Sequence, residues 1–225
     1  MNEPGSSPMM TKSELAYASV RDKILSGEFP PGSVLNQATL ARTIGISTTP
    51  LREALRRLKA ERLVELDAHR DARVTELNSE EARDLLEIRR SLDPLAVSLA
   101  AQRRTKADIA EIRAAATGLH SLPTDPEQRQ LLHHRRFHGA IYRASHNDLL
   151  IETLDGLWDK ADRYRRLALE IDRGPEARAN KDEEHRMLVE CVVAGEADAA
   201  ADLMREHIET SLGAQAARRL INAER

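Results

Sequence analysis

The sequence predicts a mainly α-helical protein with two domains. Its 225 residues are more than one compact core usually needs. Charged residues make up 32% of the chain and aromatic residues only 3%, a composition that favours helices packed through aliphatic side chains over sheets. We expect a small N-terminal domain of three helices and a β-hairpin, followed by an all-helical bundle of about six helices.

Composition also excludes several classes of protein. The only cysteine, Cys191, cannot form an internal disulfide, and no apolar run approaches the length of about 20 residues needed to span a bilayer. Residues 1–10 lack the basic and apolar regions of a signal peptide, so we expect a disordered lead-in and a cytoplasmic protein with no membrane partner. The net charge is -3, although residues 11–78 carry 11 Lys and Arg against 9 Asp and Glu. Whether this region can bind nucleic acid therefore depends on where its Lys and Arg residues lie on the surface.

The first domain begins with three predicted helices. Apolar residues at helical spacing over 13–26 predict the first, and the stretch "GEFPPGS" ends it. A short second helix follows over "QATLARTIG" and is closed by Gly45. Thr48, Thr49 and Pro50 are suited to the start of a third helix, which runs through "TPLREALRRLKAERL". Two helices joined by a tight glycine-containing turn form a helix-turn-helix.

The third predicted helix has two distinct faces. Leu51, Leu55 and Leu58 form an inward stripe. Five cations project from its other faces: Arg52, Arg56, Arg57, Lys59 and Arg62. Such a helix can enter a DNA major groove with its N-terminal residues at the bases. Taken alone, the basic helix is also compatible with a solvated surface balanced by Glu53 and Glu61.

The segment "LVELDAHRDARVTEL" predicts a β-hairpin with Arg70 and Arg73 near its tip. The order of helix, Pro-Gly turn, two helices and hairpin resembles the winged helix-turn-helix of the GntR family of bacterial transcription regulators. The resemblance rests on "ILSGEFPPGSVLNQATLARTIGISTTPLREALRRLKAERLVEL" and "RVTEL". It implies a regulator that binds double-stranded operator DNA.

Three positions depart from the pattern of that family. Its members often carry arginine where this chain has Ala38 and Thr48, and a wing glycine where it has Asp71. The resemblance therefore assigns DNA contact to the residues that remain in the reading helix and wing: Thr48, Thr49, Arg52, Arg56, Arg70 and Arg73. The reading helix and wing of one chain, which we call the reading head, cover half of a typical DNA site. We therefore expect a homodimer on a pseudo-palindromic operator.

The second domain is predicted to be entirely helical. Asn78, followed three residues later by Glu81, is typical of a helix N-cap with its capping-box partner. We therefore expect a DNA-binding domain over 11–77 and a helical domain over 78–221. Periodicity and helix breakers predict six helices in the second, at about 79–102, 105–119, 126–145, 147–173, 177–194 and 197–220.

Four histidines in the second domain have a spacing that suits metal binding. His134 and His138 are four residues apart on one predicted helix, so they share a face about 6 Å apart along the axis. His185 lies 10 residues before Gly195 and His207 lies 12 after it. Antiparallel helices would place these two side chains at similar heights, about 15 to 18 Å from the turn. Converging imidazoles indicate a transition metal rather than calcium or magnesium, although surface or core histidines would also fit the pattern.

Three segments of the second domain resemble the metal-containing FCD ligand-binding domain of the FadR branch of the GntR family: "HRRFHGAIYRASHN", "DEEHRMLVECVVAGEADAA" and "MREHI". The resemblance implies that His138, His185 and His207 are metal ligands and that His134 replaces the usual aspartate. A neutral nitrogen in that place favours zinc, with nickel or copper as alternatives.

Arg89, in "LLEIRRSLDPLAVSLAA", has two interpretations. It can form a salt bridge with Asp93 four residues later. The resemblance implies instead that it faces a cavity and binds the carboxylate of a small organic-acid effector beside the metal.

Three functions remain open for the whole chain. They are a regulator controlled by metal and effector, a DNA-binding protein with a purely structural metal, and a metal-dependent hydrolase. The hydrolase leaves the first domain unexplained, and the sequence has no HExxH pattern, phosphate loop or nucleophile elbow. We therefore expect a transcription regulator, acting as a repressor, with no enzymatic activity.

Overall fold

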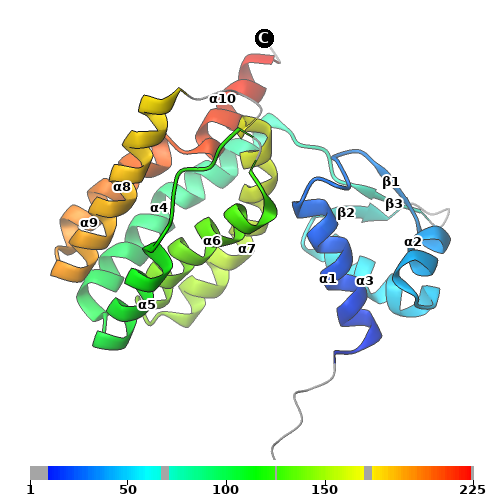
Figure 1. Ribbon diagram of the computed structural model, residues 1–225. Helices are drawn as coiled ribbons and strands as arrows, with labels where there is room; N and C mark the ends of the chain where they lie inside the picture. The colour runs from blue at the N-terminus through cyan, green and yellow to red at the C-terminus, as the bar shows by residue number, and fades with distance from the viewer. Residues whose placement is uncertain (1–9, 67–70, 125, 170–173, 224–225) are drawn as a thin grey trace, which may run out of the picture. The chain divides into compact units, whose positions relative to one another are not determined.

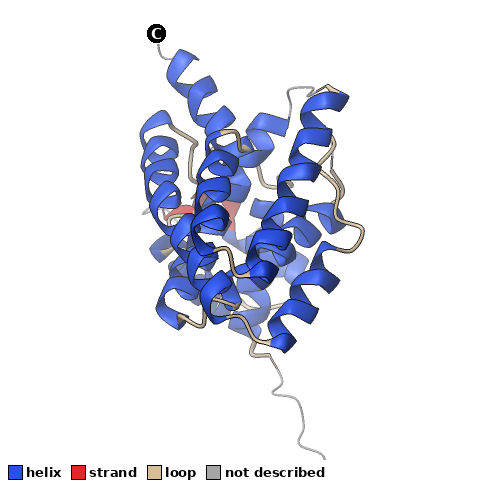
Figure 2. Cartoon of the chain, turned by 90° about the vertical axis from the view of Figure 1, so that its left-hand side faces the viewer, coloured by secondary structure: helices blue, strands red, loops and turns tan. Residues whose placement is uncertain are grey.

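The computed structural model describes residues 10–66, 71–124, 126–169 and 174–223 (Figure 1). Its contacts divide the chain into two compact units, Met1–Glu76 and Leu77–Arg225. Helices make up most of the described chain (Figure 2), and none of those described is long and apolar enough to cross a membrane. The predicted fold class, a winged helix-turn-helix followed by a helical bundle, is confirmed. The predicted lead-in over 1–10 lies almost wholly outside the described residues.

The N-terminal unit contains three helices and three short strands. In chain order they are α1 (Lys12–Leu25), β1 (Val34–Asn36), α2 (Gln37–Ile44), α3 (Thr48–Ala60), β2 (Val64–Leu66) and β3 (Asp71–Val74). Asn36 caps α2 by accepting a hydrogen bond from the amide of Thr39. Gly45 ends α2 with a φ of 79°, a left-handed conformation that glycine adopts without steric cost. The cap fixes the start of α2, and the glycine sets the short turn that joins α2 to α3.

Helix α3 packs against α1 through the predicted apolar stripe. Leu51, Leu55 and Leu58 are fully buried. The helix ends at Ala60, earlier than predicted, because Arg62 has a left-handed φ of 59°. Arg62 therefore belongs to the turn before β2 and does not extend the cationic surface of the helix.

The small sheet holds one strand that the sequence analysis did not predict. Its strands run antiparallel in the order β1-β3-β2, with Leu35 of β1 opposite Ala72 of β3. A strand as short as β1 carries little pattern of its own, and its conformation depends on pairing with β3. The tip of the predicted hairpin, including Arg70, lies outside the described residues.

The C-terminal unit is built around one long helix. Its described helices are α4 (Ser79–Arg103), α5 (Lys106–Ala116), α6 (Gln128–Arg143), α7 (Asp148–Leu169), α8 (Pro175–Ala194), α9 (Ala197–Glu209) and α10 (Leu212–Ala223). Helix α4 contacts α6, α7, α8, α9 and α10. Asn78 caps α4 by accepting a hydrogen bond of 2.7 Å from the amide of Glu81, as its sequence position predicted. The predicted capping box does not form, because the Glu81 carboxylate accepts from Lys160 and Tyr164 instead. The first turns of α4 are thereby fixed, and with them the position of Arg89.

The single helix predicted over 197–220 is wrong, because the chain breaks after Glu209 and starts again as α10. Ser211 begins the new helix by accepting a hydrogen bond from the amide of Ala214. Lys181 on α8 donates to the carbonyl of His207, and so satisfies a backbone acceptor near the end of α9. A serine followed by Gly213 was the available sequence signal for this break.

Candidate functional site

Four imidazole rings meet inside the C-terminal unit, and we call them the histidine cluster: His134, His138, His185 and His207. His134 and His138 lie on α6, His185 on α8 and His207 on α9. The ring centroids of His138 lie 4.7 Å from His134, 5.4 Å from His185 and 5.3 Å from His207. His185 and His207 are 4.9 Å apart. The structure thus brings together all four histidines that the sequence analysis singled out for metal binding.

The nitrogens of this cluster have few partners within the described chain. Both ring nitrogens of His138 and both of His185 are buried without a hydrogen bond among the described residues. A buried polar atom without a partner is costly and calls for an explanation. Donor atoms of His134, His138 and His185 all lie within 4.8 Å of one another. Nitrogens around a tetrahedral zinc ion are about 3.4 Å apart, so a small inward movement of side chains would let these residues hold one.

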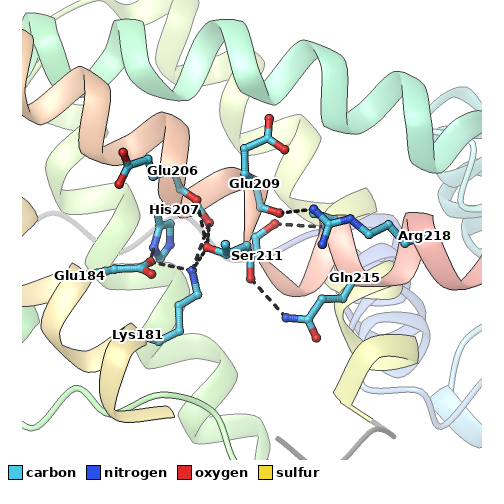
Figure 3. Close-up of polar contacts among 10 residues, drawn as sticks. Lys181, Glu184, Glu206, His207, Glu209, Ser211, Gln215 and Arg218 are labelled. Carbon is cyan, nitrogen blue, oxygen red and sulfur yellow. Dashed lines mark hydrogen bonds and ion pairs between the residues drawn. The ribbon is translucent and has the colours of Figure 1, made fainter. Parts of the chain in front are cut away.

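His207 is oriented by a carboxylate on the neighbouring helix. Its Nδ1 lies 2.7 Å from Glu184 Oε2, and Figure 3 shows Glu184 and Lys181 converging on the His207 end of α9. Burial would raise the pKa of Glu184, but its hydrogen bonds from His207 and Lys181 lower it to about 2. The carboxylate is therefore charged and holds the His207 proton on Nδ1, which leaves the lone pair of Nε2 available. A histidine bonded in this way to a carboxylate is common around protein-bound metals.

All four rings of the cluster are neutral at physiological pH. Burial lowers the pKa of His138 far below its ordinary value, and the neighbouring His207 and His185 lower it further. Burial likewise lowers the pKa of His185 to about 2. For His134 the causes are burial and then the charge of Arg165. Neutral imidazole is the form that binds metal.

The cluster forms part of the wall of a cavity of about 500 Å³, some of which is open to solvent. Three cations, Arg89, Arg165 and Lys181, also line it, and the described lining includes no Asp or Glu. Trp158 lines it too, and its buried indole nitrogen has no hydrogen-bond partner among the described residues. The break between α9 and α10 completes the wall with Ser211. Cations and an unpaired N–H donor in one cavity suit an anionic ligand.

Arg89 forms the salt bridge with Asp93 and also lies in the cavity wall. It lines the cavity, and its Nε and Nη2 donate to Asp93 Oδ2 at 3.1 and 2.6 Å. Tyr142 donates to the same oxygen at 3.0 Å, whereas Asp93 Oδ1 has no hydrogen bond in the described chain. Burial would lower the pKa of Arg89, but the charge of Asp93 raises it above the ordinary value. The ion pair keeps a fixed positive charge at the cavity wall.

Arg165 on α7 contacts the histidine cluster directly. Its Nη2 lies 3.2 Å from His134 Nδ1, and its Nη1 donates to Asp162 at 2.7 Å. The guanidinium carbon lies 5.1 Å from the Trp158 ring, so the cation also stacks on the indole. Arg165 is only 4% exposed. These contacts hold the guanidinium in one place beside His134.

The remaining histidines of the segment "HHRRFHGAIYRASHN" lie outside the cluster. His133 points to the carbonyl of Ala115 at 3.0 Å, so it connects α6 to α5. His146 pairs with Asp108 at the surface. Asn147 caps α7 through the amide of Leu150. His133 and His146 thus contact residues of α5, whereas Asn147 acts as a helix cap.

The candidate DNA-contact residues lie on the N-terminal unit. Thr48, Thr49, Arg52 and Arg56 are all exposed on α3. Arg52 donates from Nε to Gln37 Oε1 at 3.2 Å. Arg73 is exposed on β3, where its Nη1 donates to the carbonyl of Gly32 at 2.6 Å.

Sequence reasoning missed several residues of the cavity. Trp158 and Arg165 on α7 and Lys181 on α8 line the cavity, and Glu184 on α8 contacts His207 behind it. None of the four was singled out, because a periodic pattern does not say which polar residues face inward together. The Lys181 and Glu184 pair immediately before His185 was the one usable signal.

Comparisons with known proteins agree with this two-part architecture. Residues 12–74 match "Bacterial regulatory proteins, gntR family", and residues 84–210 match the "FCD domain". The HTH-type transcriptional repressor GlaR of Escherichia coli (strain K12) is 31% identical over 206 residues, which are 87% of this chain and 92% of GlaR. The Glc operon transcriptional activator of the same organism is 26% identical over 220 residues, which are 88% of this chain and 86% of the activator. The solved structure of E. coli McbR/YncC has a TM-score of 0.76 at 23% identity, covering 96% and 100% of the two chains, and supports the fold.

The matched regions define a class of protein, a DNA-binding transcription regulator with a winged helix and a separate helical domain. The chain belongs to the GntR family of bacterial regulatory proteins and carries an FCD domain.

We expect the metal-free protein to lose stability as the pH falls below about 6.5. In the unfolded chain histidines take up protons near that pH, whereas the buried rings have lowered pKa values and do not. The unfolded state then binds more protons, so the free energy of unfolding decreases by up to about 1.4 kcal/mol per pH unit for each such ring.

Urea unfolding in a chelator, between pH 7.5 and 5, measures this dependence. The variant His185→Leu removes one of the buried rings, so its free energy of unfolding should vary less steeply with pH. An equally steep dependence in the variant would contradict the expectation.

Proposed function

We propose that the protein is a repressor of the FadR branch of the GntR family, whose helical domain binds a divalent metal and a small organic-acid effector that modulates operator binding. The observation that carries this proposal is the histidine cluster, with unpartnered buried nitrogens, in the wall of a cavity that also presents three cations. A site of this kind has no evident structural purpose when empty, because each unpaired polar atom in it opposes folding.

The residues that would hold the metal are those of the histidine cluster. An all-nitrogen donor set favours zinc, with nickel or copper as alternatives, over calcium or magnesium, which prefer oxygen. His207 supports this role through its hydrogen bond to Glu184. When bound, the metal would supply a Lewis-acidic centre that attracts an anionic oxygen.

The effector is proposed to be a small carboxylate. Arg89 presents a charge fixed by Asp93, and Arg165 and Lys181 add positive charge on other sides of the cavity. The unpartnered indole N–H of Trp158 is a further donor. A hydrolase is not favoured, because the described lining offers no carboxylate to act as a general base.

The reading head is proposed to comprise Thr48, Thr49, Arg52 and Arg56 of α3, together with the wing residues Arg70 and Arg73. The exposure of the four α3 residues supports their part in it. The start of such a helix is the part that reaches base edges in known complexes. The contact from Gln37 supports Arg52 as an oriented reader, since it limits the rotamers of that side chain.

Loss of Arg52 should weaken specific binding more than nonspecific binding. One good base contact contributes about 1 to 3 kcal/mol, so Arg52→Ala should reduce affinity for a duplex selected from random sequence by about 5- to 150-fold. Lys59→Ala is the matched control, because Lys59 is exposed near the opposite end of α3. Fluorescence anisotropy with selected and scrambled duplexes measures both. Equal losses on the two duplexes for Arg52→Ala would assign this residue to phosphate contact.

We propose that the protein acts as a homodimer on a pseudo-palindromic operator, because one winged helix per chain covers only half of a typical site. Analytical ultracentrifugation of the full chain with the selected duplex should give two chains per duplex. One chain per duplex would refute the proposal.

Metal binding should be lost when any of His138, His185 or His207 is replaced by alanine. We expect one metal per chain in the wild type and an affinity lower by at least about 100-fold in each variant, since loss even of an outer-shell partner costs 10- to 100-fold. Trp158 is the only tryptophan of the chain, and its ring lies 5.3 Å from that of His138. Quenching of its fluorescence by added Ni²⁺ therefore reports occupancy directly.

His133→Ala is the control for metal binding, because its ring is tied to Ala115 and lies outside the cluster. Full occupancy in a His185→Ala, His207→Ala double variant would overturn the metal site. Native mass spectrometry with metal analysis of the wild-type protein tests the proposal as a whole, since a retained carboxylic acid would reveal metal and effector together. DNA binding that no carboxylate alters, in a protein that retains metal, would favour a purely structural metal.

A further inference from the structure

The contact between Arg165 and His134 restricts what His134 can do. A guanidinium carries only hydrogen-bond donors. With Arg165 Nη2 at 3.2 Å from His134 Nδ1, that nitrogen must be the acceptor and cannot carry a proton. A neutral imidazole has one N–H and one lone pair, so the proton lies on Nε2.

Neither nitrogen of His134 is then available to a metal. A ligand nitrogen must offer a free lone pair. The lone pair of Nδ1 is taken by Arg165, and Nε2 is protonated. His207 differs from His134 in this respect, because its proton goes to Glu184 and the lone pair of Nε2 remains free.

The restriction depends on histidine at this position. A carboxylate has two oxygens, so it could accept from Arg165 with one and bind a metal with the other. An imidazole accepting from Arg165 cannot do both. Arg165 does not easily move away, since it also donates to Asp162 and stacks on Trp158.

We propose that His134 is not a metal ligand and that Arg165 fixes it as a hydrogen-bond donor in the cavity wall, beside a site of three protein ligands: His138, His185 and His207. The inference rests on the proposed metal site and revises its ligand set, from the four histidines of the cluster to three. Within the described chain Nε2 of His134 has no hydrogen-bond partner, so its N–H is free to bind an acceptor in the cavity. A metal held by three protein ligands keeps a coordination position for an outside ligand, as catalytic zinc sites do.

The first test is the number of ligands around Co²⁺ in the full-length protein. Metal affinity is measured by competition with a chelator, and the visible absorption of bound Co²⁺ reports its coordination. We expect His134→Phe to bind Co²⁺ within about threefold of the wild type with an unchanged spectrum, whereas His138→Phe loses at least about 100-fold, as expected for a ligand. His134→Asp should bind more tightly and change the spectrum, because a carboxylate can both pair with Arg165 and coordinate.

The second test releases His134 from its partner. Arg165→Met should allow His134 to coordinate, which raises the affinity for Co²⁺ and alters the spectrum. The double variant Arg165→Met, His134→Phe should lose that gain. A gain of the same size in both variants would show that Arg165 acts through its charge alone and would overturn the inference.

The third measurement needs no variant and no metal. Nitrogen chemical shifts of the His134 ring in the wild-type protein should identify the tautomer with the proton on Nε2, and a proton on Nδ1 would overturn the inference. If the wild type binds Co²⁺ but His134→Phe loses at least 100-fold, only the inference fails. If the wild type binds neither Co²⁺ nor Zn²⁺, the proposed metal site itself fails.

Discussion

The packing of four neutral imidazoles, three of them buried, beside cations is the constraint on which the helical unit depends. Each ring comes from a helix that packs on α4, so the helices must bring polar atoms together in their interior. The free energy that stabilises this unit must therefore come from hydrophobic packing around the rings, where Phe137, Tyr142 and Leu188 are fully buried. A polar centre inside an aliphatic bundle lowers stability unless something binds there, which makes stability and ligand binding interdependent.

Fixed charges surround this centre and are themselves held by partners. Asp93 and Tyr142 hold Arg89, Asp162 holds Arg165, and Glu184 holds Lys181. Each cation is paired with a carboxylate, so none is left as an uncompensated buried charge. The same partners fix tautomers, because Glu184 determines the proton on His207 and Arg165 determines the proton on His134. These contacts fix the cations in the cavity wall, which would lower the cost of ordering side chains around the proposed anionic effector.

The N-terminal unit separates its apolar core from its polar surface. A compact apolar core of Leu51, Leu55 and Leu58 leaves the opposite surface of α3 free for polar and cationic residues. Gly45 sets the turn before this helix, and β1 adds an outer strand beside β3. The apolar core and the proposed DNA-contact residues thus lie on different faces of one helix, so we expect substitutions on the exposed face to leave the core intact.

The sequence by itself determined the helical class, the cap at Asn78, the glycine turn before α3 and the identity of the four clustered histidines. These features are local, since each depends on spacing within one helix or on a capping side chain next to it. Tertiary structure alone decided the strand β1, the break between α9 and α10, and the choice of Trp158, Arg165 and Lys181 as cavity residues. It also decided which nitrogen of His134 carries the proton. These features depend on contacts between residues that are far apart in the sequence. A periodic sequence pattern indicates which residues face inward, but not which residues they contact there.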